Sequence, residues 1–248
     1  MNTRKKKQAE GFSDAEWKKL QDVAQSISNP GENLNSRMFL TIGRSMLLRG
    51  GSYRDLKFSG FEICNVEGNI FLAYEEYFSK NKQAGLRDLS VQHRTLRAFQ
   101  DLENPNFSAP ELFQELQKTR PTEAPDALFL QPLTSSDQDG VLFKRMALGK
   151  NTLDKFLQKL CMKAELPVRS NHAMRRTEIQ SLQRQGVPID RIMQASGHRS
   201  LAGAEADTRD NITLLSEERH SKIIAKRRLS PKLILKDCNA SKESLSIC

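Results

Sequence analysis

The sequence predicts an α+β domain that is mostly helical and carries one small antiparallel β-sheet. Apolar residues recur at helical spacing through most of the second half of the chain. Residues 61–74 instead form two apolar runs on either side of Glu67-Gly68-Asn69, which is the pattern of a β-hairpin about a glycine turn. The 248 residues are enough for one large domain or two small ones.

The first half of the chain is expected to begin with two helices. Ser13 and Glu16 have the spacing of a capping box, which predicts a helix from there to about Ser28. Asn29-Pro30-Gly31 predicts a break after it. The other elements expected around the hairpin are a helix over 35–48, a turn over 80–82 and a short third strand over 86–91.

The second half is predicted to be mainly helical. The expected helices cover 110–118, 152–165, 171–185, 188–196 and 211–226. Ser170 is the candidate cap of the third of these, and Pro188 suits the first position of the fourth. Gly186 and Gly197 are predicted to end the third and fourth helices, because glycine readily adopts the left-handed backbone that ends a helix.

The composition favours a protein that binds polyanions. The formal net charge is +9 and the pI is about 9.5, and nucleic acid is the commonest partner of such a surface. No apolar run reaches the roughly 18–20 residues of a membrane span, and no apolar stretch follows the basic N-terminus as in a secretory signal. The four cysteines lie far apart without a Cys-x-x-Cys pair, which favours neither a zinc site nor a disulfide framework.

The residues that suggest chemistry lie between 170 and 200. His172 and Arg175 are three apart and would share one face of a helix. Gly197 and His198 follow the next expected helix, where a turn can present the imidazole. A phosphate would suit such a set, because arginine offers planar paired donors to its oxygens. Taken singly, such residues are more often ordinary surface groups or helix caps.

The order of these motifs resembles a known family. His-x-x-Arg-Arg-Thr, a helix, Gly-Val-Pro, a second helix and Gly-His-Arg-Ser are similar to the C-terminal half of the tyrosine recombinases, the phage-integrase type. In detail they resemble the crypton-type recombinase domain, which eukaryotic genomes have also domesticated into host proteins. The resemblance implies the tyrosine-recombinase/integrase catalytic-domain fold over about residues 36–212. The further segments that carry it are 48–57, 77–86, 129–133 and 148–153.

The resemblance implies a pocket for a DNA phosphate that needs no metal and no cofactor. In the family a tyrosine attacks the phosphodiester and two arginines clamp its non-bridging oxygens. By resemblance, Arg49 and Arg175 form the clamp, and Lys80 protonates the leaving oxygen. His172 and His198 would complete the pocket. Lys82 is a second candidate for the acid, and the alternative reading makes Arg49 a helix-end cation and Lys80 a solvated turn residue.

Two departures from the family pattern bear on catalysis. Asp207 stands at the position of the nucleophilic tyrosine, nine residues after His198, and the chain's tyrosines all lie well upstream. Ser52 stands where the first-arginine motif usually has an acid, which weakens the orientation of Arg49. The sequence therefore predicts a recombinase-derived domain, related to DNA integration and recombination, that binds duplex DNA through phosphate contacts and is catalytically inactive.

Two alternatives remain open at this point. One is an active site-specific recombinase with an unrecognised nucleophile, and the other is a domesticated adaptor that binds protein. Expected partners besides DNA are a second copy on DNA or other nuclear proteins, with no membrane. Lys226-Arg227-Arg228 favours a nuclear address or a backbone contact, although a solvated tail would look the same. The expected location is the nucleus in a eukaryote and otherwise the cytoplasm.

Four parts are expected along the chain. Residues 1–12 form a disordered basic N-terminus, and residues 13–34 form a helix and linker that is too short for the family's DNA-clamping domain and is expected to be its remnant. Residues 35–228 form the recombinase-like domain, and residues 229–248 form a flexible tail.

Overall fold

The computed structural model describes residues 11–76, 94–134, 140–198 and 200–208. The helices are α1 (Asp14–Gln25), α2 (Pro30–Ser45), α3 (Ala109–Thr119), α4 (Lys150–Asp154), α5 (Phe156–Lys163), α6 (His172–Arg184), α7 (Ile189–Ser196) and α8 (Leu201–Thr208). The strands are β1 (Phe61–Val66), β2 (Asn69–Glu76), β3 (Arg94–Phe99), β4 (Leu130–Pro132) and β5 (Phe143–Ala147). Short 3-10 turns are η1 (Ser52–Arg54), η2 (Phe58–Gly60) and η3 (Pro105–Phe107). Within these ranges no helix combines the length and apolarity needed to cross a membrane.

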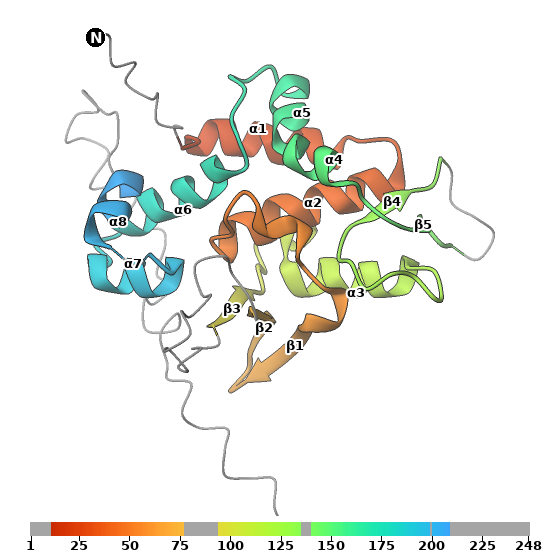
Figure 1. Cartoon of the computed structure of the whole chain (residues 1–248), viewed down its shortest axis with the longest axis horizontal. Coiled ribbons are helices and arrows are strands. Elements are labelled where there is room, and N and C mark those ends of the chain that lie inside the picture. The colour runs from red at the N-terminus through yellow and green to blue at the C-terminus, as the bar shows by residue number, and fades with distance from the viewer. Residues whose placement is uncertain (1–10, 77–93, 135–139, 199, 209–248) are drawn as a thin grey trace, which may run out of the picture.

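Helix α2 runs through the middle of the molecule, with α1 and α5 on one side and α3 and the three-stranded sheet on the other (Figure 1). Its Phe39 is fully buried and stacks on Tyr53 and Phe156, with ring centroids 4.2 and 4.6 Å apart. Each such buried ring contributes about 1.5–3 kcal/mol to folding. The resulting core joins Trp17 of α1 to Met174 of α6.

The predicted capping box and hairpin are confirmed. Ser13 caps α1 and Glu16 returns the bond to the backbone of Ser13. Strands β1 and β2 are antiparallel, and Glu67 and Gly68 both have positive φ, as a two-residue hairpin turn requires. Strand β3 pairs with β2. The third strand predicted over 86–91 and the turn over 80–82 lie outside the described residues.

Several predicted boundaries are corrected. Asn29 accepts a bond from the backbone of Glu32 and so caps α2, which begins at Pro30 rather than at 35. The helix expected over 152–165 is divided at Lys155 into α4 and α5. Asn171 rather than Ser170 precedes α6, without a side-chain cap bond, and Pro188 precedes α7 instead of opening it.

Two elements were not predicted. Strands β4 and β5 form a second sheet, so the expectation of one sheet is wrong. β4 is only three residues long and gives no alternating pattern. Helix α8 also went unpredicted, because among its described side chains only Ala204 and Asp207 are buried. The helix expected over 211–226 lies outside the described residues.

Helices α6, α7 and α8 pack together at one end of the molecule (Figure 1). Ile179 and Leu182 of α6 meet Ile192 of α7 in a small second core, which also takes in Leu47 from the end of α2. Gly186 and Gly197 end α6 and α7 as predicted, both with positive φ. This second core brings the turn after α2 against the turn after α7.

Candidate functional site

Five side chains from four elements meet at this end of the molecule. Arg49 follows α2, His172 and Arg175 lie on α6, His198 follows α7, and Asp207 lies on α8. Their contacts with one another and with adjacent backbone are all within 4 Å. The structure thus brings together positions that are far apart in the sequence.

Arg175 is the centre of the cluster. Only 1% of the residue is exposed, which is unusual for arginine outside a paired site. Its Nη1 donates to the carbonyl oxygen of Leu47 over 2.8 Å, and its Nη2 lies 3.1 Å from Nε2 and 3.3 Å from Nδ1 of His198. Its Nε lies 3.8 Å from Oδ2 of Asp207. Buried charge of this kind requires compensating charge and hydrogen bonds.

The carbonyl that Arg175 uses is held by a strained helix end. Leu47 has φ 52°, and the amides of Leu47 and Leu48 donate to the carbonyls of Arg44 and Gly43. This is a Schellman motif with leucine in the position that glycine usually takes. The left-handed backbone costs a non-glycine residue about 1–2 kcal/mol. The left-handed turn at Leu47 places its carbonyl within hydrogen-bond distance of Arg175.

His198 is oriented by the end of α7. Gly197 has φ 71°, and the amide of His198 donates to the carbonyl of Met193 over 3.1 Å. Nε2 of His198 lies 3.1 Å from Oδ2 of Asp207, and Nδ1 lies 2.7 Å from Oγ of Ser196. Nε2 of His198 therefore lies between the carboxylate of Asp207 and the guanidinium of Arg175, and Nδ1 faces the Ser196 hydroxyl. Arg49 joins the same turn, because its Nη2 donates to the carbonyl of Gly197 over 2.9 Å.

Asp207 supplies the negative charge of the cluster. Its Oδ1 lies 3.1 Å from Nε2 of His172, and its side chain is only 10% exposed. Burial raises the pKa of the Asp207 carboxyl, but hydrogen bonds from His172 and His198 and the charges of these rings lower it by more. The net result is a pKa well below the usual value, so Asp207 is ionised at neutral pH.

This lowered pKa predicts an acid-sensitive contribution to stability. A carboxyl whose pKa is lower in the folded protein stabilises the fold fully above its unfolded pKa, about 3.9, and loses that stabilisation as the pH falls. The groups that face Asp207 are His172 and Arg175 from α6 and His198 from the end of α7.

We expect the unfolding free energy of the natural protein to fall more steeply between pH 5 and pH 2 than that of Asp207→Asn, because only the natural protein carries the titrating carboxyl. Chemical denaturation at each pH measures both curves. Parallel curves would contradict the assignment of the lowered pKa.

The sequence analysis anticipated part of this cluster. Arg49, His172, Arg175, His198 and Asp207 converge, whereas Lys80 and Lys82 lie outside the described residues. The roles of all these residues toward DNA stay predictions. Ser52 is half-buried in η1, and its amide donates to the carbonyl of Arg49.

Two positioning groups were missed. Ser196 stands directly before Gly197-His198, and a hydroxyl beside a histidine at a helix end could have suggested the contact. The Leu47 carbonyl leaves no sequence signal, because a backbone group is present at every residue.

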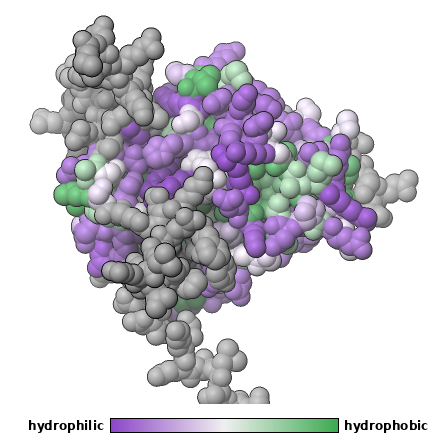
Figure 2. Space-filling model, in the orientation of Figure 1, coloured by the Kyte–Doolittle hydropathy of each residue, from purple (hydrophilic) through white to green (hydrophobic). Residues whose placement is uncertain are grey.

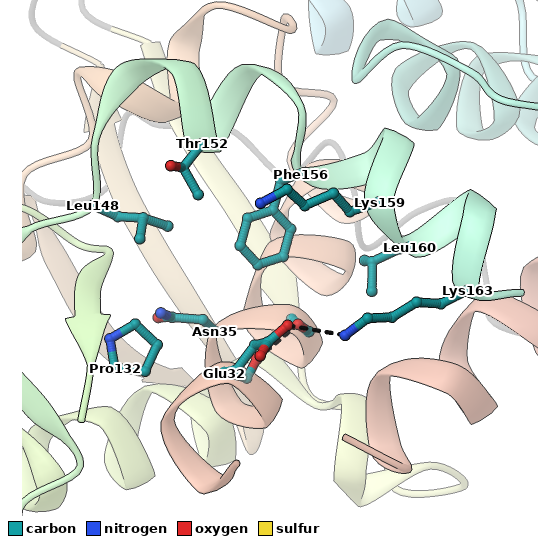
Figure 3. A pocket seen from close by; sticks show the side chains of 10 residues that line it. Glu32, Asn35, Pro132, Leu148, Thr152, Phe156, Lys159, Leu160 and Lys163 are labelled. Carbon is teal, nitrogen blue, oxygen red and sulfur yellow. Dashed lines mark hydrogen bonds and ion pairs between the residues drawn. The ribbon is translucent and has the colours of Figure 1, made fainter. Parts of the chain in front are cut away.

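A separate recess lies at the other half of α2 (Figure 3). It has a volume of about 210 Å³ and is lined by residues of α2, α4 and α5, together with Pro132 and Leu148. Asn35 at its floor donates through Nδ2 to the carbonyl of Leu130, and its Oδ1 meets no hydrogen-bond partner among the described residues. Lys163 and Glu32 form an ion pair of 3.1 Å across the recess. The buried Arg175 cluster does not open into it.

Comparison with known proteins identifies the fold. No protein-family model matches the chain, and no curated protein matches significantly. Among solved structures, the XerH site-specific recombinase in a pre-cleavage complex with its difH substrate has a TM-score of 0.56 at 16% identity, covering 86% of this chain and 52% of that one. The XerA recombinase has a TM-score of 0.52 at 20% identity, covering 92% of this chain and 66% of that one.

A third solved structure agrees. A lambda integrase dimer bound to a COC′ core site has a TM-score of 0.50 at 14% identity, covering 85% of this chain and 62% of that one. At these identities the likeness shows the fold alone. The described part of the chain therefore has the fold of the tyrosine recombinase catalytic domain, as predicted, and the chain spans about half to two thirds of these structures.

Proposed function

We propose that the chain is a DNA-binding domain derived from a tyrosine recombinase, related to DNA recombination and integration but catalytically inactive. The observation that carries the proposal is the meeting of Arg49, His172, Arg175 and His198 within this fold. Several solved structures of the same fold are complexes with DNA. The crypton-type origin, the roles of the pocket residues and the division at residue 35 belong to this proposal.

The exposed cations support contact with the phosphate backbone. Lys155, Lys159 and Lys163 are each four residues apart along α5 and its N-cap, so they follow one face of the helix. Further exposed basic residues lie on β5 and at the start of α4, and they are Lys144, Arg145 and Lys150. Figure 2 shows a molecular face that is mainly hydrophilic over the described residues. Because Arg175 is buried, we assign initial DNA contact to these lysines and not to the pocket.

We expect the full chain to bind random-sequence duplex DNA weakly, at about micromolar dissociation constants, with affinity that falls steeply as salt rises. Each phosphate contact releases counterions, so the slope of log affinity against log salt counts the contacts. Fluorescence anisotropy at a series of salt concentrations measures this.

A charge-reversal pair tests the surface. Lys155→Glu with Lys159→Glu is expected to lower DNA affinity at least about ten-fold and to flatten the salt slope. The matched control reverses Lys57, which precedes η2, and Lys118 on α3, two other exposed lysines. Equal losses of DNA affinity in both pairs would show that the effect comes from net charge alone. Absence of binding at low salt would favour the alternative function, an adaptor that binds protein.

The finer expectations complete the proposal. Self-association on DNA and a nuclear location would fit a domesticated recombinase domain. Lys226-Arg227-Arg228 supports the nuclear location through its charge alone, and this segment lies outside the described residues.

A further inference from the structure

The carboxylate of Asp207 presents the same kind of acceptors that a phosphodiester would bring to the cluster. Its Oδ1 faces Nε2 of His172 and its Oδ2 faces Nε2 of His198, each over 3.1 Å. Oδ2 also faces the guanidinium of Arg175. A phosphodiester likewise offers two non-bridging oxygens that share its negative charge. The carboxylate therefore faces groups that would otherwise suit an external oxyanion.

The cluster as it stands is closed to such an anion. Arg175 is 1% exposed. The Asp207 side chain packs against it and is itself only 10% exposed. A phosphate that approached the guanidinium would have to share the site with a carboxylate. Two like charges in one desolvated site repel by several kcal/mol, so the two anions exclude one another.

The same carboxylate is a principal attachment of α8. Among the described side chains of α8, Ala204 and Asp207 are buried, and they are three residues apart on the face toward α6 and α7. Leu201 at the start of α8 is 51% exposed. Withdrawal of Asp207 from the cluster would therefore also loosen the packing of α8.

We propose that Asp207 is a resident anion that occupies an oxyanion site formed by His172, Arg175 and His198 and excludes phosphate-class anions until it withdraws. The part of this inference that names a DNA phosphodiester as the displaced anion rests on the proposed function. The preference of the site for an oxyanion does not rest on the proposed function, and inorganic phosphate tests this preference without DNA.

The experiment titrates inorganic phosphate into the full chain at constant ionic strength, with chloride as the exchanged ion. Thermal unfolding reports binding, because a ligand that binds only the folded protein raises its melting temperature. We expect Asp207→Asn to bind phosphate at least about ten-fold more tightly than the natural protein, since one repelling charge is gone. Folding of this variant in phosphate but not in chloride would be the strongest form of the same result.

The matched control is Glu205→Gln, which removes one negative charge from an exposed position of the same helix. It is expected to bind phosphate like the natural protein. Equal phosphate affinity in Asp207→Asn and the natural protein would overturn the proposal. So would an equal gain in Glu205→Gln, because the effect would then come from net charge.

A second measurement decides the matter if Asp207→Asn folds in neither salt. The chain has four histidines, so the ring resonances of His172 and His198 can be followed by NMR in the natural protein. We expect phosphate to leave both unmoved, and saturable shifts would show an open site and overturn the proposal. If the variant binds phosphate but no DNA, the proposed function is contradicted, and the proposal that Asp207 occupies an oxyanion site is still supported.

Discussion

Replacement of Arg175 by alanine is expected to lower the free energy of unfolding by about 3–5 kcal/mol, because it removes a buried cation that lies 3.8 Å from the buried carboxylate of Asp207. The guanidinium has 1% exposure and holds the Leu47 carbonyl, the His198 ring and Asp207 at once. Removal of the side chain leaves these three groups without this partner and opens a cavity beneath α8. Chemical denaturation measures the loss.

The control for this variant is Arg191→Ala, which removes an exposed arginine from α7. Its effect should stay within about 0.5 kcal/mol, as for most surface substitutions. Arg175→Lys should fall between the two, since lysine keeps the charge and loses the planar fork. An Arg175→Ala protein as stable as the control would contradict the description of the cluster as one interdependent unit.

Local rules account for the part of the fold that the sequence predicts well. The Ser13–Glu16 capping box and the turn at Gly68 depend on residues within four positions of one another, and the structure contains both. Gly197 is predictable for the same reason, because the helix end that it forms needs a left-handed residue at that place. The His172 and Arg175 pair follows from helical spacing alone.

The remainder depends on contacts that no local pattern encodes. Helix α8 has no continuous apolar stripe, and it is held where Ala204 and Asp207 meet residues of α6 and α7. Asn29 and Pro30 read equally well as a break or as a helix start, and the packing of α2 in the core selects the second. The resemblance placed Asp207 at the nucleophile position. Its ion pairs with His172, Arg175 and His198 could not be predicted, because they form only where α6, α7 and α8 pack together.

The second large effect that we expect is a complete absence of a covalent protein–DNA adduct. Incubation of the full chain with a nicked suicide duplex, followed by denaturing electrophoresis, should give no slower protein band under conditions in which an active tyrosine recombinase on its own site gives one. Clamp residues can stabilise charge on a phosphate, but they supply no nucleophilic oxygen. A band would contradict the prediction, and mapping of its attachment would name the nucleophile.

The described tyrosines argue for the same outcome. Tyr53 lies inside the core between Phe39 and Phe129, and burial raises the pKa of its hydroxyl well above the usual value. Tyr74 is buried in β2, with its hydroxyl near the carbonyl of Asp55. Neither can approach a phosphate held near Arg175 without unfolding of the core, so a phenol would have to come from outside the described residues or from another chain.

Asp207→Tyr tests whether the expected absence of an adduct is due to Asp207 alone or also to the orientation of Arg49. The substitution places a phenol on the inward face of α8, next to His172, Arg175 and His198, and removes the carboxylate that repels phosphate. An adduct formed by this variant alone would assign the expected inactivity to one side chain. If Asp207→Tyr folds and binds DNA but still forms none, the orientation of Arg49 is the next feature to test, because Ser52 stands where the family that the sequence resembles usually has an acid. Ser52→Glu combined with Asp207→Tyr is then the next variant, because a carboxylate beside Arg49 would restore the charged neighbour that orients a guanidinium.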